Sequence, residues 1–141
     1  MSLRSRAREV ALQILFEDDV NPRQTAAELE QFVAGRLNNP EGEAFALTLI
    51  LGVRRNQAEL DAAISQIADN WSLNRMAPTD RNCLRLGAYE ILYGETPYKV
   101  AINEAVELAK RFGRAQSAAF VNGILDKLPR GDSETGSQGT E

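Results

Sequence analysis

Three arginines at every second position near the start of the chain are the first residues with a recognisable chemistry. Arg4, Arg6 and Arg8 all precede the first acidic residue, Glu9. The guanidinium group is a planar donor that matches the oxygens of a phosphate. Cations at a helix start oppose the helix macrodipole, at roughly a few tenths of a kcal/mol each, and broken local rules tend to mark functional sites. The three arginines are therefore candidate ligands for nucleic-acid phosphates.

A second candidate surface lies in residues 97–128. On a helical wheel one arc is apolar and the other polar, and the apolar arc holds Ala101, Ile102, Ala105, Val106, Leu108, Ala109 and Phe112. We expect Gly113 to end this helix with a positive φ and Ser117 to cap the next one. Phe120 lies at the edge of the next apolar arc, so it is either a rim residue of the core or a ring available for stacking.

The remaining periodicity predicts the helices that must position these residues. Apolar side chains recur at three- and four-residue spacing, and Thr25 with Glu28 forms a capping box. Asn21-Pro22, Asn38-Asn39-Pro40 and Gly94 with Pro97 separate the segments. The expected helices span 4–17, 25–37, 41–54, 57–71, 78–93, 97–112 and 117–128. The chain is therefore predicted to be an all-α, single-domain bundle of about seven helices.

The helix expected at 78–93 is apolar nearly all round, which is typical of a central, buried helix. Gly87 inside it costs about 1 kcal/mol relative to alanine, so we expect a neighbouring helix to approach closely there. We expect Trp71 and Leu73 to close one end of the core. The tail 129–141 contains no large apolar residue and is expected to be disordered.

Composition limits the chemistry further. The 141 residues carry a net charge of −4 and a pI near 5.0, which as a bulk property argues against nucleic-acid binding, although residues 1–16 and 98–114 are locally basic. There is no histidine and one cysteine, Cys83, so we expect no metal site, no cofactor and no disulfide. Cys83 is expected to be a packing group in a reducing cytoplasm, and neither a membrane span nor a signal peptide is predicted.

Catalytic patterns are also missing from the sequence. Without histidine the commonest general base is absent, and Cys83 has no histidine partner. No glycine-rich phosphate loop occurs, and Glu104 and Glu107 are expected to pair with neighbouring cations. We therefore predict that the protein is not an enzyme.

Three segments together carry a family resemblance. VAINEAVELAKRFG followed by FVNGILDKL resembles the signature of the NusB family, and RSRAREVALQILFE (4–17) and TDRNCLRLGAYEILY (79–93) fit the same family in the same order. These are bacterial transcription antitermination factors that bind RNA. The resemblance covers residues 4–128, which implies a NusB-like RNA-binding domain at 1–128.

The resemblance implies a site and partners. One surface for single-stranded RNA with a boxA-type sequence would consist of Arg4, Arg6, Arg8, Lys99, Lys110, Gln116 and Phe120. The arginines would neutralise phosphates, Phe120 would stack on a base, and Gln116 would bind a base edge. The family also pairs with a small-subunit ribosomal protein, NusE, for which we expect contacts at Asp80, Arg81, Arg85 and Tyr89. The setting would be the RNA polymerase elongation complex with other Nus factors, and the protein would be a monomer or a homodimer.

Two alternatives stay open from the sequence. A NusB-like domain also resembles the N-terminal part of certain RNA methyltransferases, and Arg81 and Arg85 would suit a small helical enzyme with an anionic substrate.

Ser5 interrupts the basic start and Ser117-Ala118-Ala119 lacks charge, so weak RNA binding without the partner is expected. The RNA hypothesis requires that Arg4–Arg8 and the Lys99–Phe120 region meet in space as one exposed cationic surface.

Overall fold

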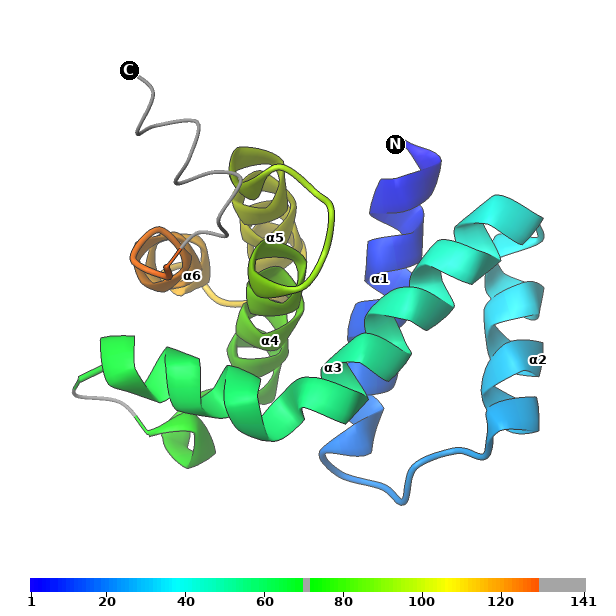
Figure 1. Cartoon of the computed structure of the whole chain (residues 1–141), viewed down its shortest axis with the longest axis horizontal. Helices are drawn as coiled ribbons and strands as arrows, with labels where there is room; N and C mark the ends of the chain where they lie inside the picture. Colours follow the sequence, from blue (N-terminus) through cyan, green and yellow to red (C-terminus); the bar gives the residue numbers. More distant parts are fainter. Residues whose placement is uncertain (70–71, 130–141) are drawn as a thin grey trace.

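The fold is an all-helical bundle. The computed structural model describes residues 1–69 and 72–129, and this part contains six α-helices and no strand. The elements in chain order are α1 (Leu3–Asp18), α2 (Ala26–Leu37), α3 (Pro40–Ile67), the 3₁₀ turn η1 (Leu73–Arg75), α4 (Pro78–Leu92), α5 (Tyr98–Phe112) and α6 (Ser117–Leu125). In Figure 1, α3 crosses α1 and leads to the end of the bundle that holds α4 and α6. Trp71 and the tail after Pro129 lie outside the described residues.

The difference between seven predicted helices and six observed ones comes from α3. The segments expected at 41–54 and 57–71 form one helix of 28 residues with a kink at Asn56, whose φ and ψ are −108° and 15°. The Asn56 side-chain amide donates to the Gly52 carbonyl at 2.8 Å, which is the kind of local contact that bends a helix. Asparagine therefore kinks the chain here without ending the helix.

Of the three capping features predicted for helix ends, one agrees with the structure and two differ from it, and the helices predicted to end at 71 and 128 end at Ile67 and Leu125. The capping box of Thr25 and Glu28 at the start of α2 is confirmed. Gly113 has a φ of −99°, not a positive one, and Gln116, not Ser117, is the N-cap of α6. The Ser117 hydroxyl instead accepts from the Arg114 backbone N–H at 2.9 Å. Glycine is needed at 113 because a Cβ there would lie 2.5 Å from the Ser117 hydroxyl oxygen.

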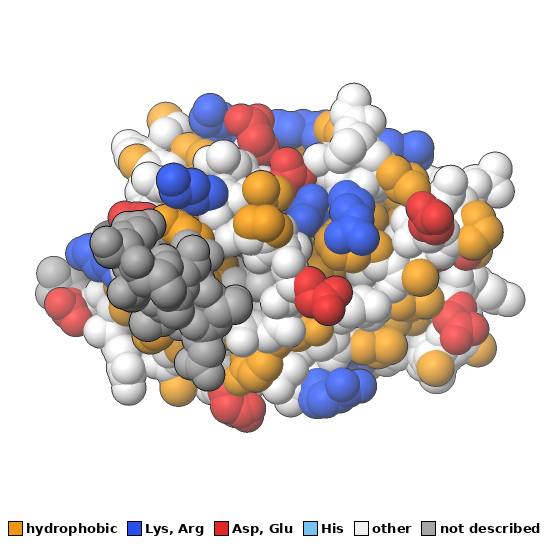
Figure 2. Space-filling model, turned by 45° about the horizontal axis from the view of Figure 1, so that its top comes forward, with side chains coloured by type: hydrophobic (Ala, Val, Ile, Leu, Met, Phe, Trp, Pro, Cys, Tyr) orange, Lys and Arg blue, Asp and Glu red, His pale blue; other side chains and the backbone are white. Residues whose placement is uncertain are grey.

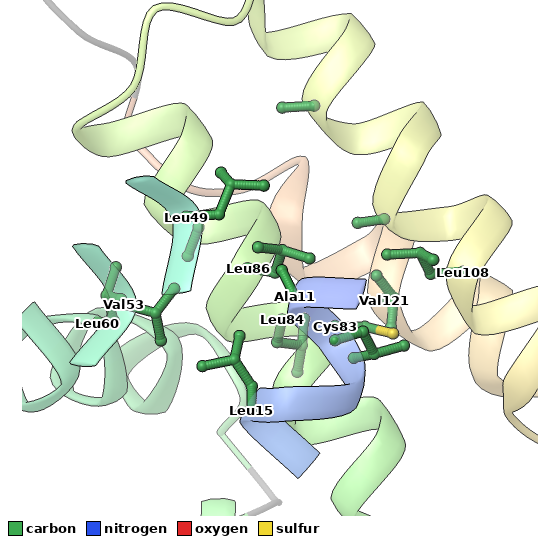
Figure 3. Packing of buried hydrophobic residues seen from close by; sticks show 14 of the residues in the cluster. Ala11, Leu15, Leu49, Val53, Leu60, Cys83, Leu84, Leu86, Leu108 and Val121 are labelled. Atoms are coloured by element: carbon green, nitrogen blue, oxygen red, sulfur yellow. The ribbon is translucent and has the colours of Figure 1, made fainter. Parts of the chain in front are cut away.

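Helix α4 is central and buried, as predicted. It packs against α1, α3, α5 and α6, and Leu73 of η1 is buried beside the same core. Figure 3 shows buried side chains of α4 packed with side chains of its neighbours, among them Ala11, Leu15, Leu49, Val53, Leu60, Cys83, Leu84, Leu86, Leu108 and Val121. Burial raises the pKa of the Cys83 thiol to about 12, so this sulfur is a neutral packing group at physiological pH.

The expected close approach at Gly87 is confirmed. A Cβ at this position would lie 2.6 Å from Leu125 Cδ1 of α6 and 3.1 Å from the Ala105 Cβ of α5. Both neighbours are buried, and the Ala105 methyl is fixed to its backbone. The packing of α4 against α5 and α6 therefore depends on the absence of a side chain at Gly87. Helices α5 and α6 carry the second group of predicted RNA-binding residues.

We predict that Gly87→Ala lowers the free energy of unfolding by about 1–3 kcal/mol, the usual cost of overpacking a core. Gly123→Ala is the matched control, because nothing lies within 4 Å of a Cβ there. Removing a helical glycine without a clash should stabilise by up to about 1 kcal/mol. Urea denaturation of both variants measures the difference, and equal stabilities would contradict the close approach.

Candidate nucleic-acid interface

Arg8 is not on the surface, which corrects its predicted role as a phosphate ligand. Its residue is only 4% exposed, and Nε and Nη2 donate to the two carboxylate oxygens of Glu90, each at 2.8 Å. Nη1 donates to Glu104 at 3.1 Å. Burial lowers the pKa of Arg8, but the hydrogen bonds and charge of Glu90 and Glu104 raise it above its ordinary value. Arg8 is thus a buried cation held by two acids.

The other two arginines of the start are exposed but engaged. The Arg4 guanidinium carbon lies 4.4 Å from the centroid of the Phe45 ring. Arg6 Nη2 donates to the backbone carbonyl of Arg36 at 3.3 Å, in the last turn of α2, where a cation is favourable. These tertiary contacts offset the unfavourable placement of cations at the N-terminus of α1. The unusual helix start therefore has a structural cause.

The two segments that had to meet are in contact, but they do not form one exposed cationic surface. Side chains link α1 to α5, because the Ser5 hydroxyl donates to Glu104 at 2.6 Å and Arg111 pairs with Glu9 at 2.8 Å. Arg4 shares a hollow with Pro97 and Val100, which flank Lys99 at the start of α5. Acids lie among these cations, so the surface is mixed in charge and not a continuous basic field. Figure 2 shows such an alternation of basic, acidic and hydrophobic groups on one face.

The predicted RNA residues separate along α5. Arg4 and Lys99 lie at its first turn, and Lys110 is exposed near its last turn, 3.5 Å from Glu107. Gln116 and Phe120 lie beyond its end, at the start of α6. Since α5 has 15 residues, its ends are about 22 Å apart at about 1.5 Å per residue. The predicted set therefore does not form one compact site, although it borders one helix.

Gln116 and Phe120 line the same depression, which we call the α6 hollow. Its wall also includes Arg75, Asp80 and Arg114, and its volume is about 310 Å³. Gln116 is exposed, and Phe120 is half-buried and packs against the core. Phe120 is therefore a rim residue of the core, the first of the two alternatives, and it also borders a surface depression.

A neighbouring depression, the α1 hollow, contains residues that sequence reasoning missed. It has a volume of about 530 Å³ and is lined among others by Arg6, Phe16, Arg36, Thr79 and Phe112. Phe16 is 39% and Phe112 48% exposed, although Phe112 was expected inside because it lies on the apolar arc of α5. Helical spacing carried no such signal for Phe16, because at about 100° per residue it lies about 80° from both Arg6 and Arg8 on the wheel.

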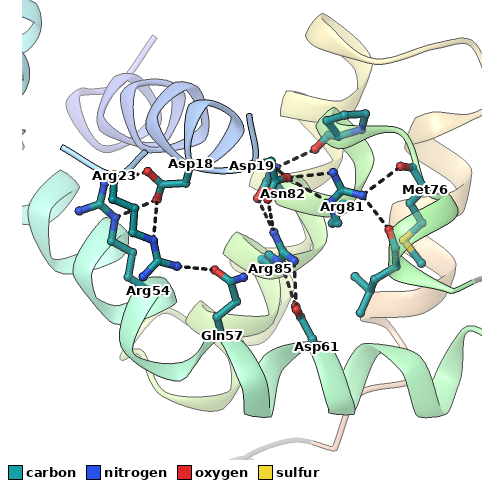
Figure 4. A network of polar contacts seen from close by, with 12 residues as sticks. Asp18, Asp19, Arg23, Arg54, Gln57, Asp61, Met76, Arg81, Asn82 and Arg85 are labelled. Atoms are coloured by element: carbon teal, nitrogen blue, oxygen red, sulfur yellow. Dashed lines mark hydrogen bonds and ion pairs between the residues drawn. The ribbon is translucent and has the colours of Figure 1, made fainter. Parts of the chain in front are cut away.

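The residues predicted for the protein partner mostly turn inward. Arg85 donates to both Asp61 carboxylate oxygens at 2.8 and 3.0 Å and to Asp19 at 3.0 Å. Arg81 binds Asp19 and the carbonyls of Leu73 and Met76, as Figure 4 shows. Both arginines are thus committed to internal acids, which removes their predicted surface role and also the alternative of an anionic-substrate site built on them.

The other two predicted partner residues differ from each other. The Tyr89 ring lies where a Gly52 side chain would be and stacks against Tyr93 with centroids 5.9 Å apart. Asp80 is half-buried and lines the α6 hollow. Its Oδ1 atom is buried and accepts no hydrogen bond within residues 1–69 and 72–129.

The described residues offer no group of three or more histidine, cysteine or acidic side chains suited to a metal ion. Among the helices of that same part, none combines the length and the apolarity needed to cross a membrane.

Comparison with known proteins gives one consistent result. The family model described as "NusB family" matches residues 5–130. "Transcription antitermination protein NusB" of Desulfotalea psychrophila is 47% identical over 135 residues, covering 91% of this chain and 96% of the relative. Its counterpart in Sorangium cellulosum is 44% identical over 129 residues, covering 91% and 92%.

Solved structures agree with the sequence relatives. The structure of T. maritima NusB has a TM-score of 0.83 and 35% identity, covering 95% of this chain and 96% of that one. A crystal structure of the antitermination factors NusB and NusE in complex with dsRNA has a TM-score of 0.77 and 27% identity, covering 89% and 95%.

We predict that Arg8→Gln lowers the free energy of unfolding by about 3–5 kcal/mol, because it leaves Glu90 buried without its cation. The double variant Arg8→Gln/Glu90→Gln should recover part of this loss, since it removes both charges. Chemical denaturation of the wild type, both single variants and the double variant completes the cycle. Additive losses would show that the two side chains are not coupled.

Asp19 provides a pH-dependent prediction. Burial raises the pKa of Asp19, but hydrogen bonds from Asn82, Arg85 and Arg81 lower it below the ordinary value. A carboxyl whose folded pKa is depressed stabilises the protein above its unfolded pKa, and this stabilisation is lost as the pH falls through the folded pKa.

Asp19→Asn should therefore be less stable than the wild type at pH 7, and the difference should shrink as the pH falls below about 4. Urea denaturation between pH 7 and pH 3 measures the difference. A constant difference over this range would show that the Asp19 charge does not contribute.

Proposed function

The chain belongs to the NusB family, and we propose that it is a non-catalytic RNA-binding factor of bacterial transcription antitermination. In this role it acts in the cytoplasm on single-stranded boxA-type RNA. It works together with the ribosomal protein NusE and other Nus factors in the RNA polymerase elongation complex. The names of its relatives and the likeness to a NusB–NusE–dsRNA structure support the proposal.

The observation that carries the RNA role is the α1 hollow. Two exposed phenylalanine rings, Phe16 and Phe112, lie in one depression with the guanidinium groups of Arg6 and Arg36. Single-stranded nucleic acids bind to this combination, because bases stack on aromatic rings while cations neutralise the backbone. Arg111 adds a further cation, 5.1 Å from the Phe112 ring centroid.

The proposed RNA path runs from the α1 hollow to the α6 hollow. The two hollows adjoin, because residues close in sequence line both of them. Thr79 lines the α1 hollow and Asp80 the α6 hollow. On either side of Gly113, Phe112 lines the α1 hollow and Arg114 the α6 hollow. Phe120 offers a further stacking surface and Gln116 a base-edge contact on this path. Lys110 borders it, whereas Arg4 and Lys99 extend it towards the start of α5. Arg8 contributes indirectly, by holding α1 in place.

A mixed-charge surface explains why a partner would be needed. Glu9 and Asp80 lie within the two hollows and repel phosphates. Since phosphate neutralisation supplies most of the sequence-independent affinity, this protein alone should bind RNA weakly. NusE would add the missing contacts, and of the four residues predicted to meet it Asp80 and Tyr89 line surface depressions.

We predict that Arg6→Gln/Arg36→Gln weakens binding of a labelled boxA-type RNA and reduces the salt slope by about 0.7 for each phosphate that the variant no longer neutralises. Fluorescence anisotropy at several salt concentrations, with and without NusE, measures both quantities. Arg55→Gln is the control, because Arg55 is an exposed arginine of α3 outside both hollows.

A scrambled RNA of equal length tests sequence preference in the same titrations. The proposed site is wrong if the double variant keeps the affinity and the salt slope of the wild type. The proposed function itself fails if the folded wild type, with NusE present, binds the boxA-type and scrambled RNAs equally or not at all.

A further inference from the structure

A third depression, which we call the tyrosine hollow, lies where the starts of α1 and α3 meet the end of α4 (Figure 1). Its volume is about 940 Å³, and Tyr89 and Tyr93 lie on its wall. Asp80, which lines the α6 hollow, is at the opposite end of α4, about 20 Å away at about 1.5 Å per residue. Of the residues assigned to the proposed RNA path, only Arg4 lines the tyrosine hollow. This end of the molecule is therefore left over by the proposed function.

The charges of the tyrosine hollow favour a cation. Among the described residues its lining contains one cation, Arg4, and three acids, Glu41, Glu90 and Glu95. Arg8 neutralises Glu90 at 2.8 Å. Glu41 and Glu95 are exposed, and within the described part of the chain neither carboxylate has an ion pair or a hydrogen bond. Two free carboxylates thus border this hollow, and they repel phosphate and attract positive charge.

The Arg4 side chain shows how this hollow holds an arginine. Its guanidinium carbon lies 4.4 Å from the centroid of the Phe45 ring, which is a favourable cation–π contact. Within residues 1–69 and 72–129 it pairs with no acid, so Glu41 and Glu95 keep their charges available. The hollow contains a further ring, Tyr93, over which no cation of the described residues lies.

The Tyr93 ring is held in a fixed orientation. It is 47% exposed and stacks on Tyr89, with centroids 5.9 Å apart and planes inclined by 22°. Tyr89 in turn fills the space that the missing side chain of Gly52 leaves open. Thr96, in the loop after α4, donates to Glu90 at 2.7 Å and ties this loop to the core. Little order therefore has to be gained when a ligand binds here.

These features favour arginine over other cations. The planar guanidinium of arginine stacks on an aromatic ring and donates to a carboxylate at the same time, whereas the ammonium of lysine is compact and strongly hydrated. A volume of about 940 Å³ is near the upper end of small-ligand sites, roughly 300–1,000 Å³. The hollow therefore has room for more than one side chain of an extended peptide.

We propose that the tyrosine hollow binds an arginine from a basic segment of a further protein partner, in addition to RNA and NusE. The guanidinium stacks on Tyr93 and pairs with Glu95, while Glu41 attracts neighbouring basic residues of the segment. Charge complementarity and the uncovered ring identify this partner by its chemistry. The inference goes beyond the proposed function, because it does not require RNA.

The test uses three labelled peptides of equal length, in which glycine and serine flank two arginines, two lysines or two citrullines. Citrulline has the shape of arginine without its charge. Fluorescence anisotropy with the full chain at low salt should show that the arginine peptide binds most tightly. The citrulline peptide should bind at least about threefold more weakly, because it loses a cation–π contact and an ion pair.

Variants of the hollow locate the binding site. Tyr93→Leu should weaken the arginine peptide about two- to fivefold, the loss of one exposed cation–π contact, whereas Tyr93→Phe keeps the ring and should bind like the wild type. Glu95→Gln should weaken it by a similar factor, and added salt should reduce this difference. Glu59→Gln is the charge-matched control, because Glu59 is an exposed acid of α3 outside this hollow.

Thermal denaturation verifies the fold of each variant. If Tyr93→Leu unfolds the protein, the preference for arginine over citrulline and the effect of Glu95→Gln still decide. The inference is overturned if the arginine and citrulline peptides bind equally, or if Tyr93→Leu and Glu95→Gln both bind like the wild type. It is also overturned if Glu59→Gln weakens binding as much as Glu95→Gln, because the attraction would then come from the overall charge.

Other occupants of the hollow are tested with the same Tyr93→Leu variant. Its binding of boxA-type RNA with NusE, and its sedimentation as a monomer or a dimer, should match those of the wild type. A loss of RNA or NusE binding, or a changed oligomeric state, would assign the hollow to that partner and overturn the inference. Failure of the wild type to bind boxA-type RNA would reject the proposed function and leave the peptide result standing.

Discussion

The bidentate ion pair between Arg8 and Glu90 determines where the first helix lies. It joins α1 to the C-terminal half of α4, and Thr96 donates to the same Glu90 carboxylate at 2.7 Å. Glu104 extends the cluster to α5 by accepting from Arg8 and from Ser5. Burying two charges is costly unless their hydrogen bonds are satisfied. Here they are satisfied in one geometry, which specifies the rotation of α1 about its axis.

That rotation decides which side chains the proposed interface receives. With Arg8 directed inward, Arg6 and Phe16 face solvent on another flank of α1, beside Arg36 and Phe112. The surface combines exposed rings with a few arginines and some acids. An acidic protein can therefore present an RNA surface, because affinity from stacking depends less on net charge than affinity from phosphate neutralisation.

A second polar network makes the other end of the interface rigid. Asp19 at the end of α1 accepts from Arg81, Asn82 and Arg85 of α4, and Asp61 of α3 completes the set. Because Arg81 also binds the carbonyls of Leu73 and Met76, the wall of the α6 hollow is anchored to the core. Sites on fixed elements hold their geometry better than sites on loops, and here buried arginines support exposed ones.

The sequence by itself determined the all-helical fold, the central place of α4, the close approach at Gly87 and the family. The helices follow from apolar residues that recur every three to four positions on the buried face. The family follows from three sequence segments that occur in the order expected for it.

Only the tertiary structure decided which arginines are exposed. Arg4, Arg6 and Arg8 look alike in the sequence, but Glu90 and Glu104, more than eighty residues away, bury just one of them. Likewise Arg81 and Arg85 face inward, and Phe112 is exposed because α5 ends there. Such differences depend on contacts between distant segments, which spacing along one helix does not encode.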